Sequence, residues 1–475
     1  MSVWKAAKLF SVPEQTLRDR VKGKISIDCI SSGSAPILSQ YEEAKIVKHT
    51  RIVANLGYGY TRQEVCDVAT YYAVQLGKRD PNKPLTLNWF RRFIKRWPEL
   101  CVCKPRSLEV TRAKSTSAQV ISSYFDGLQK VIKKYNLEDK PRLIFNVDEK
   151  GITLIHTPPQ VVAGAEFHPN YVTSGKSVTT TILGCGIAIG TTIPLYYVFA
   201  GKRLLLELLK DAAPGTDASM YDSGWSNTDI FRKFLMEHFI KYIPHREPGQ
   251  HLLLILDGHK SHIAVDIIEW AKQNNIVIFV LPAHTSHVLQ PLNVACFGPF
   301  QKMYNSECYK LTRKNTCGIT RYDICSLTSK VYLKVLSAEN LQAAFRKTGI
   351  YPYNPSAISE ECVQPSEIYI DSFSTSVNSV EKTNVVTMET KESDKLPVTE
   401  SHINVPVNES EILDGIDQSA KSPSNFLCER SVSLKKSKTK LLQKQPRKCM
   451  GYIVSGKAVT ESNIEKQIHE HQKTS

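Results

Sequence analysis

The sequence predicts an α + α/β protein with a basic helical N-terminal region, an α/β domain and a disordered tail. Three observations predict this order. Apolar residues recur at helical spacing through the first part of the chain. Short β-rich runs then alternate with helical stretches over residues 140–358. Over residues 360–475 the composition shifts to Ser, Thr, Lys, Glu and Asn with few aromatic residues, which is typical of disorder.

Composition and charge favour a polyanionic partner for the N-terminal region. The 475-residue chain has a formal net charge of +15, and residues 1–120 hold 21 Lys and Arg against 10 Asp and Glu. Such a block indicates nucleic acid most simply, with a merely solvated basic face as the alternative. No apolar run reaches the roughly 18–20 residues of a membrane span, so no membrane partner is expected. None of the 12 cysteines forms a CxxC pair, which suits a reducing compartment.

Residues 1–24 are predicted to form two short helices around a turn. Apolar spacing gives the first helix one face, and Pro13 suits the first turn of the second. An amphipathic pair of helices without a DNA role is the alternative. A helix-turn-helix usually has a preceding helix, whereas this sequence starts almost at the motif, so a truncated start is a further alternative. The side chains expected to reach a DNA groove are Thr16, Arg18, Arg20, Lys22 and Lys24.

Residues 38–110 are predicted to form a second helical unit. Ser39 with Glu42, and Thr61 with Glu64, have the spacing of capping boxes. Near its end, aromatic residues at helical spacing can pack on one face of a helix while cations line the other. This is the strongest candidate recognition helix, and the cations expected to contact DNA here and just beyond it are Arg91, Arg92, Lys95, Arg96, Lys104 and Arg106.

These two units resemble the tandem DNA-binding region of the pogo/Tigger/jerky group of transposase-derived proteins, which includes the centromere-protein-B type. The matching residues are VPEQTLRDRVKGK for the first helix-turn-helix, of the psq type. NWFRRFIKRWPEL followed by KPRSLEVTRAKS carries the second and more specific match. The resemblance covers about 115 residues and implies binding to double-stranded DNA.

Two aspartates follow apolar runs in the α/β region. Asp148 follows residues 143–147, and Asp257 follows residues 252–256. Each is interpreted as ending a strand, so both are expected at one sheet edge, where carboxylates can hold metal ions. The alternative for each is a turn-capping carboxylate. Nearby histidines are expected to shape loops or to lie near substrate, and not to bind zinc: His259, His262, His284 and His287.

The order of strands and helices resembles a ribonuclease-H-like domain, and the local sequences resemble the DDE endonuclease domain of the pogo/jerky superfamily. NVDEKG surrounds Asp148, ILDGHKSH surrounds Asp257, and HTSHVLQPLNVACFGPFQK follows. The resemblance implies a third acid after QPL, but this chain has Asn293 there. An amide carries no negative charge, so we expect cleavage dependent on Mg²⁺ or Mn²⁺ to be lost or very weak. Glu149 adjoins Asp148 but is expected on the opposite face of the strand.

The first hypothesis is therefore a nuclear DNA-binding protein derived from a transposase and catalytically inactive. It needs no cofactor for DNA binding. An active metal-dependent DDE transposase and a protein-interaction scaffold with weak DNA binding are the alternatives, and the resemblance makes self-association plausible. Two basic clusters in the tail resemble a bipartite nuclear-import signal, whose residues are Lys435, Lys436, Lys438, Lys440, Lys444, Arg447 and Lys448.

Overall fold

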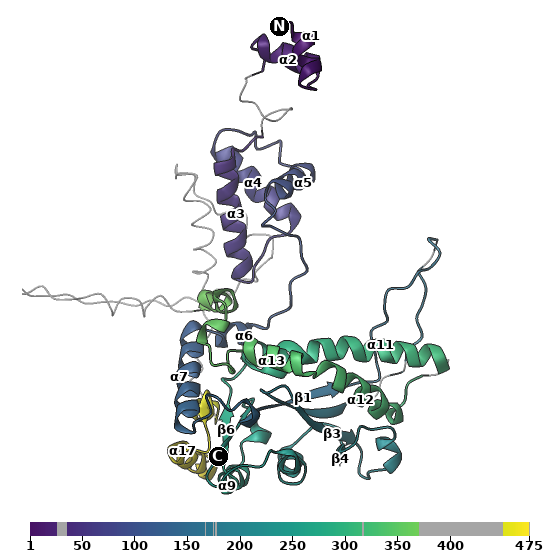
Figure 1. Ribbon diagram of the computed structural model, residues 1–475, viewed down its shortest axis with the longest axis vertical. Helices are drawn as coiled ribbons and strands as arrows, with labels where there is room; N and C mark the ends of the chain where they lie inside the picture. The colour runs from purple at the N-terminus through teal and green to yellow at the C-terminus, as the bar shows by residue number, and fades with distance from the viewer. Residues whose placement is uncertain are drawn as a thin grey trace, which may run out of the picture. The chain divides into compact units, whose positions relative to one another are not determined.

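The structure, a computed structural model, forms two compact units (Figure 1). Among the described residues, the first comprises Met1–Ala54 and Tyr58–Lys104, and the second comprises Asn55–Gly57 together with residues 105–369 and 450–474. The described residues are 1–25, 36–166, 168–173, 175, 178–315, 318–369 and 450–474. The predicted α + α/β class is confirmed, since the described residues of the first unit form only helices and those of the second include a sheet.

The N-terminal pair of helices is α1 (Val3–Leu9) and α2 (Glu14–Val21). Ser2 caps α1 by accepting a hydrogen bond from the backbone N–H of Lys5. Pro13 stands immediately before α2, with φ −52° and ψ 129°, and not inside its first turn. Two short helices around a turn are thus present as predicted.

Three helices with a shared apolar core form the rest of the first unit: α3 (Gln40–Asn55), α4 (Arg62–Gln75) and α5 (Leu87–Arg96). Both predicted capping boxes are present. The backbone N–H of Ser39 donates to Glu42 at 2.7 Å, and that of Thr61 donates to Glu64 at 2.6 Å. The core includes Ile46, Val53, Tyr72, Phe90 and Phe93. These contacts fix α5, the helix that carries most of the candidate DNA-binding cations.

A seven-stranded mixed sheet, in the order β4-β3-β2-β1-β5-β6-β7, organises the second unit. β1, β2 and β3 pair antiparallel, whereas β5 is parallel to both β1 and β6. The order from β3 to β6 is that expected for a ribonuclease-H-like domain. The strands are β1 (Ile144–Ile152), β2 (Thr180–Ile187), β3 (Thr192–Ala200), β4 (Asp217–Tyr221), β5 (Leu252–Leu256), β6 (Ile276–Val280) and β7 (Lys457–Ala458).

Helices cover both faces of the sheet (Figure 1). One apolar cluster joins the sheet to α8 (Thr228–Lys233), α9 (Val265–Gln273) and α17 (Ser462–Thr474). Two further clusters on the other face bring in α7 (Ala118–Lys134), α11 (Phe297–Asn315), α12 (Ile324–Val335) and α13 (Ala338–Lys347). The shorter helices are α6 (Val110–Ser115), α10 (Ser286–Leu289), α14 (Glu360–Val363) and α16 (Met450–Val454). No helix among the described residues has the length and apolarity needed to span a bilayer.

The second unit extends beyond the predicted limits of 140–358 at both ends. At its start, Tyr124, Phe125 and Leu128 of α7 are buried in the same cluster as the strand residues Ile144 and Leu253. α7 is therefore part of the core of the second unit.

At its other end, the prediction of disorder over the whole of 360–475 is wrong for residues 360–369, which are helical, and for residues 450–474. β7 pairs with the edge of β6, and Val459 and Ile468 are fully buried. A few well-spaced apolar residues bury this segment although its average composition is polar. The predicted nuclear-import residues lie outside the described residues.

Candidate functional site

The strands β1 and β5 bring Asp148 and Asp257 together. Asn146 of β1 pairs with Ile255 of β5, and the same register continued by two residues sets Asp148 level with Asp257. Adjacent strands lie about 4.8 Å apart, so the two carboxylates are close neighbours. The predicted pairing is present, but Asp148 does not end its strand. It lies inside β1, opposite Gly184 of β2, because the antiparallel β1–β2 ladder continues beyond the end of β5.

Asp148 is a buried carboxyl group with one free oxygen. The residue is 7% exposed, and its Oδ1 accepts a hydrogen bond from the backbone N–H of Glu149 at 2.9 Å. Its Oδ2 is buried and has no hydrogen-bond partner. Burial, together with the nearby charge of Asp257, raises the pKa of Asp148 well above its usual range. A cation or a proton donor near Oδ2 would relieve this cost.

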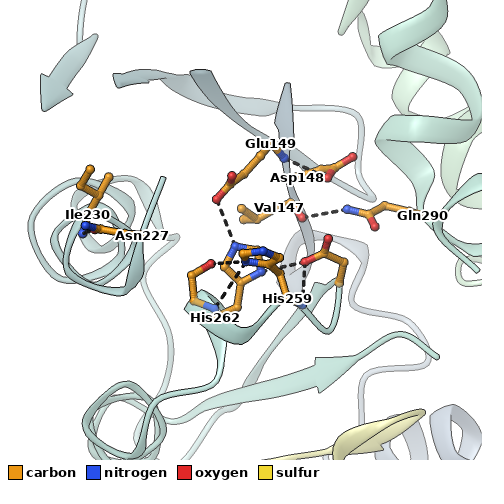
Figure 2. Close-up of polar contacts among 10 residues, drawn as sticks. Val147, Asp148, Glu149, Asn227, Ile230, His259, His262 and Gln290 are labelled. Carbon is orange, nitrogen blue, oxygen red and sulfur yellow. Dashed lines mark hydrogen bonds and ion pairs between the residues drawn. The ribbon is translucent and has the colours of Figure 1, made fainter. Parts of the chain in front are cut away.

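His262 contacts Glu149 (Figure 2), and it also contacts Asp257. Nδ1 of His262 lies 2.7 Å from Asp257 Oδ1, and its Nε2 lies 3.1 Å from Glu149 Oε1. Burial would lower the pKa of His262, but these two carboxylates outweigh burial and raise it to about 10. Burial would likewise raise the pKa of Asp257, but His262 outweighs burial and lowers it. The His262 ring is therefore held between two carboxylates, which favour its protonated form.

Asn293 follows a segment that is docked directly on β1. Gln290 donates to the carbonyl of Val147 at 3.2 Å, and the backbone N–H of Leu292 donates to Asn146 Oδ1 at 3.1 Å. Asn293 is exposed and lies in a π-helical turn, η6 (Leu292–Cys296), which leads into α11. π-turns within helices are frequent at functional sites. The anchored segment thus sets the predicted third position beside β1, with an amide in place of a carboxylate.

These donors do not fit a pair of divalent metal ions. Asp148 and Asp257 together carry at most two negative charges against four positive charges, and Asn293 adds none. Asp257 is moreover engaged by His262. Among the described residues, no three His, Cys, Asp or Glu side chains converge on one point where they could hold a metal ion. Glu307, the next acid along the chain, pairs with Lys310 on α11.

The structure gives Glu149 a partner and adds Asn146 and Gln290, which the sequence did not single out. Glu149 lies on the opposite face from Asp148, as predicted, but it is engaged by His262 and is not a bystander. Asn146 and Gln290 fix the third position to β1. The sequence gives only a weak indication that Asn146 and Gln290 have this role. Asn146 is a polar residue inside an apolar run, and such a residue needs a buried partner.

The cations of α5 divide into two groups. Arg91, Arg92 and Lys95 are exposed. Arg96 instead forms an ion pair with the buried Glu43 of α3, which also accepts a hydrogen bond from Trp97 Nε1 at 2.8 Å. Arg96 is exposed like the other three, but its guanidinium group is paired within the fold, where it helps to stabilise α5; its contact with DNA stays a prediction.

The other predicted DNA-binding residues are mostly accessible. Lys22, Lys24, Lys104 and Arg106 are exposed, whereas Thr16 and Arg20 are partly buried. Arg18 forms an ion pair with Glu14 one turn earlier on α2. An exposed pair of this kind is worth little and leaves Arg18 able to exchange partners.

Residues 176–337 match the family model described as DDE superfamily endonuclease. The match includes Asp257 and Asn293 and begins after Asp148. The match lies within the predicted DDE endonuclease-like domain of residues 140–358.

Two curated proteins are similar to parts of this chain. MFS-type transporter clz9 from Cochliobolus lunatus is 26% identical over 364 residues, which cover 74% of this chain and 34% of that protein. Chaetoglobosin A biosynthesis cluster protein C from Chaetomium globosum is 29% identical over 154 residues, which cover 32% of this chain and 36% of that protein. The chain thus spans about a third of the length of these relatives.

Among solved structures, the Mos1 mariner paired end complex with Mn is 13% identical, with a TM-score of 0.41. The similarity covers 78% of this chain and 95% of that chain. The Mos1 strand transfer complex is 12% identical with a TM-score of 0.40, over 77% of this chain and 92% of that chain.

Proposed function

We propose that this chain is a nuclear, duplex-DNA-binding protein derived from a pogo-like DDE transposase, and that it no longer cleaves DNA. The observation that carries DNA binding is the exposed cationic row of Arg91, Arg92 and Lys95 on α5. Buried Phe90 and Phe93 anchor the helix, so the cations stand on a rigid base. Such a row suits contacts to phosphates on both sides of a DNA groove.

Removing two of these cations tests the proposal. The double variant Arg92→Ala and Lys95→Ala should weaken binding of the full chain to duplex DNA at low salt. The slope of log affinity against log salt should become shallower by about 1.8, since each lost phosphate contact contributes about 0.9. Affinity that does not depend on salt, in the unmodified protein, would contradict phosphate-dominated binding.

A matched control comes from the second unit. Lys330 and Lys334 are exposed on α12 and also lie one turn apart. Replacing both with Ala removes the same charge and should leave the affinity and its salt slope within about twofold of the unmodified values. Equal weakening by both double variants would mean that net charge, and not α5, determines binding.

Loss of cleavage is supported by the donor set at the candidate site. Asn293 supplies an amide where the DDE resemblance implies a carboxylate, and His262 already engages Asp257. The runner-up function is an active metal-dependent endonuclease. It is favoured by one observation, the buried, unpartnered Oδ2 of Asp148 beside Asp257, which a cation would satisfy.

A further inference from the structure

Trp225 presents an accessible ring at the far end of β1, beyond the candidate catalytic carboxylates. The residue is 54% exposed. A Cβ added to Gly151 would lie 3.5 Å from the Trp225 ring, so the ring covers this glycine. Gly151 and Glu149 are two residues apart on β1 and share a face, which puts the ring about 7 Å along the strand from Glu149.

The loop that carries Trp225 is fixed on both sides. Before it, Gly224 has φ +72°, and a Cβ there would lie 2.0 Å from the carbonyl oxygen of Thr179. Thr181 Oγ1 also donates to the carbonyl of Gly224 at 2.8 Å. After it, Asn227 caps α8 by accepting from the N–H of Ile230 at 2.9 Å. A ring held on a fixed loop loses little conformational entropy when a ligand stacks on it.

Exposed cations lie at the same end of the sheet. Lys202 and Arg203 are exposed in the turn that follows β3, and Ala200 at the end of β3 packs against Gly224. Asp222, an exposed residue in the Trp225 loop, is an opposing charge. An accessible aromatic face flanked by cations is the arrangement with which proteins bind unpaired nucleic-acid strands, because bases stack on the ring and phosphates contact the cations.

We propose that Trp225 stacks on an unpaired nucleobase of a DNA strand, whose phosphates contact Lys202 and Arg203. Bases inside a duplex already have both faces stacked, so the ligand is a base in a single-stranded extension. The proposal rests on the proposed DNA-binding function, but its site lies in the second unit, whereas the duplex-binding helices lie in the first.

The test compares three DNA ligands with the full chain: a blunt duplex, the same duplex with a single-stranded thymidine extension, and the free thymidine oligonucleotide. Each extension carries 2-aminopurine, whose fluorescence falls on stacking. The extension should tighten binding, and Trp225→Ala should remove this gain, on the order of tenfold, together with the fluorescence change. Trp225→Phe should keep most of both. Tyr322→Ala, which removes another exposed aromatic side chain of the same unit, should change neither.

Three results would overturn the proposal: no gain from the extension in the unmodified protein, a gain that survives in Trp225→Ala, or an equal loss of blunt and extended duplex. Urea unfolding of both Trp225 variants shows whether a lost affinity gain comes from misfolding. If Trp225→Ala is misfolded, the affinity gain and fluorescence change of Trp225→Phe decide between the outcomes. Failure of the duplex-binding proposal gives a different pattern. The blunt duplex would not bind, while quenching of the free oligonucleotide by the unmodified protein, and its absence in Trp225→Ala, would still support the stacking site.

Discussion

At the scale of single residues, Asn293 is the position on which the proposed loss of cleavage depends. It occupies an exposed position on a segment that Gln290 and Leu292 dock on β1. Because the side chain is exposed, the exchange of a carboxylate for an amide costs the fold little. A substitution at this position should therefore leave the domain folded, and under the proposed function its effect should be on metal binding.

Restoring the missing charge should restore some activity. In Asn293→Asp, Mg²⁺- or Mn²⁺-dependent nicking of supercoiled DNA should rise at least about tenfold over the unmodified protein, equivalent to ~1.4 kcal/mol of barrier. Asn293→Ser is the matched control and should stay at background. Asp148→Ala combined with Asn293→Asp should also return to background. Robust nicking by the unmodified protein would show that two carboxylates suffice.

His262 should make the stability of the second unit depend on pH. Its folded-state pKa of about 10 lies above the ordinary 6.5, so its protonated form stabilises the fold. This contribution is complete below about pH 6.5 and is lost as the pH rises through about 10, on the order of a few kcal/mol. Urea unfolding of His262→Gln should show a flatter pH dependence between pH 7 and 10. Identical profiles for both proteins would exclude the charged bridge.

At the scale of elements, the sequence predicted most of the helices and the strands that carry long apolar runs. β5 and β6 are fully buried, and their unbroken apolar runs identified them as strands in the sequence. β4 and β7 were not predicted, because β4 is a short, partly polar edge strand and β7 has two residues. The end of β1 was placed too early at Asp148. Pairing with β2 continues the strand through polar residues, and a single strand's sequence does not reveal its partner.

The C-terminal helix α17 belongs to the core of the second unit, although the polar composition of residues 360–475 predicted disorder. Ile468 of α17 is fully buried with strand residues of the sheet. Ile468→Ala should therefore destabilise the second unit by roughly 2–5 kcal/mol, measured by urea unfolding. Lys466→Ala, an exposed neighbour on the same helix, should change stability by less than about 0.5 kcal/mol. If both variants matched the unmodified protein, α17 would not be part of the fold.

At the scale of the whole molecule, the two compact units divide the proposed work. The cations of α2 and α5 belong to the first unit, and Asp148, Asp257 and Trp225 belong to the second. Sequence reasoning could predict this division from the concentration of basic charge in residues 1–120. It could not give the extent of the second unit, because α7 and residues 450–474 join it through contacts between distant parts of the chain.

This division predicts that residues 1–115 bind duplex DNA without the rest of the chain. The fragment should bind within about threefold of the full chain and with the same salt slope, since the phosphate contacts are its own. In the full chain, Asp257→Ala should leave duplex affinity intact. Fluorescence anisotropy with one labelled duplex measures both. A folded fragment that fails to bind would mean that the second unit supplies the main contacts.

The pairing of β7 with β6 also determines when the sheet can be completed during synthesis. β6 ends at Val280 and β7 begins at Lys457, so the ribosome adds about 180 residues between them. At roughly 5–20 residues per second, the outer edge of β6 stays open for about 10–35 s in each nascent chain. An open strand edge can pair with another chain, so this interval is the time at which newly made molecules are most exposed to aggregation and to chaperones.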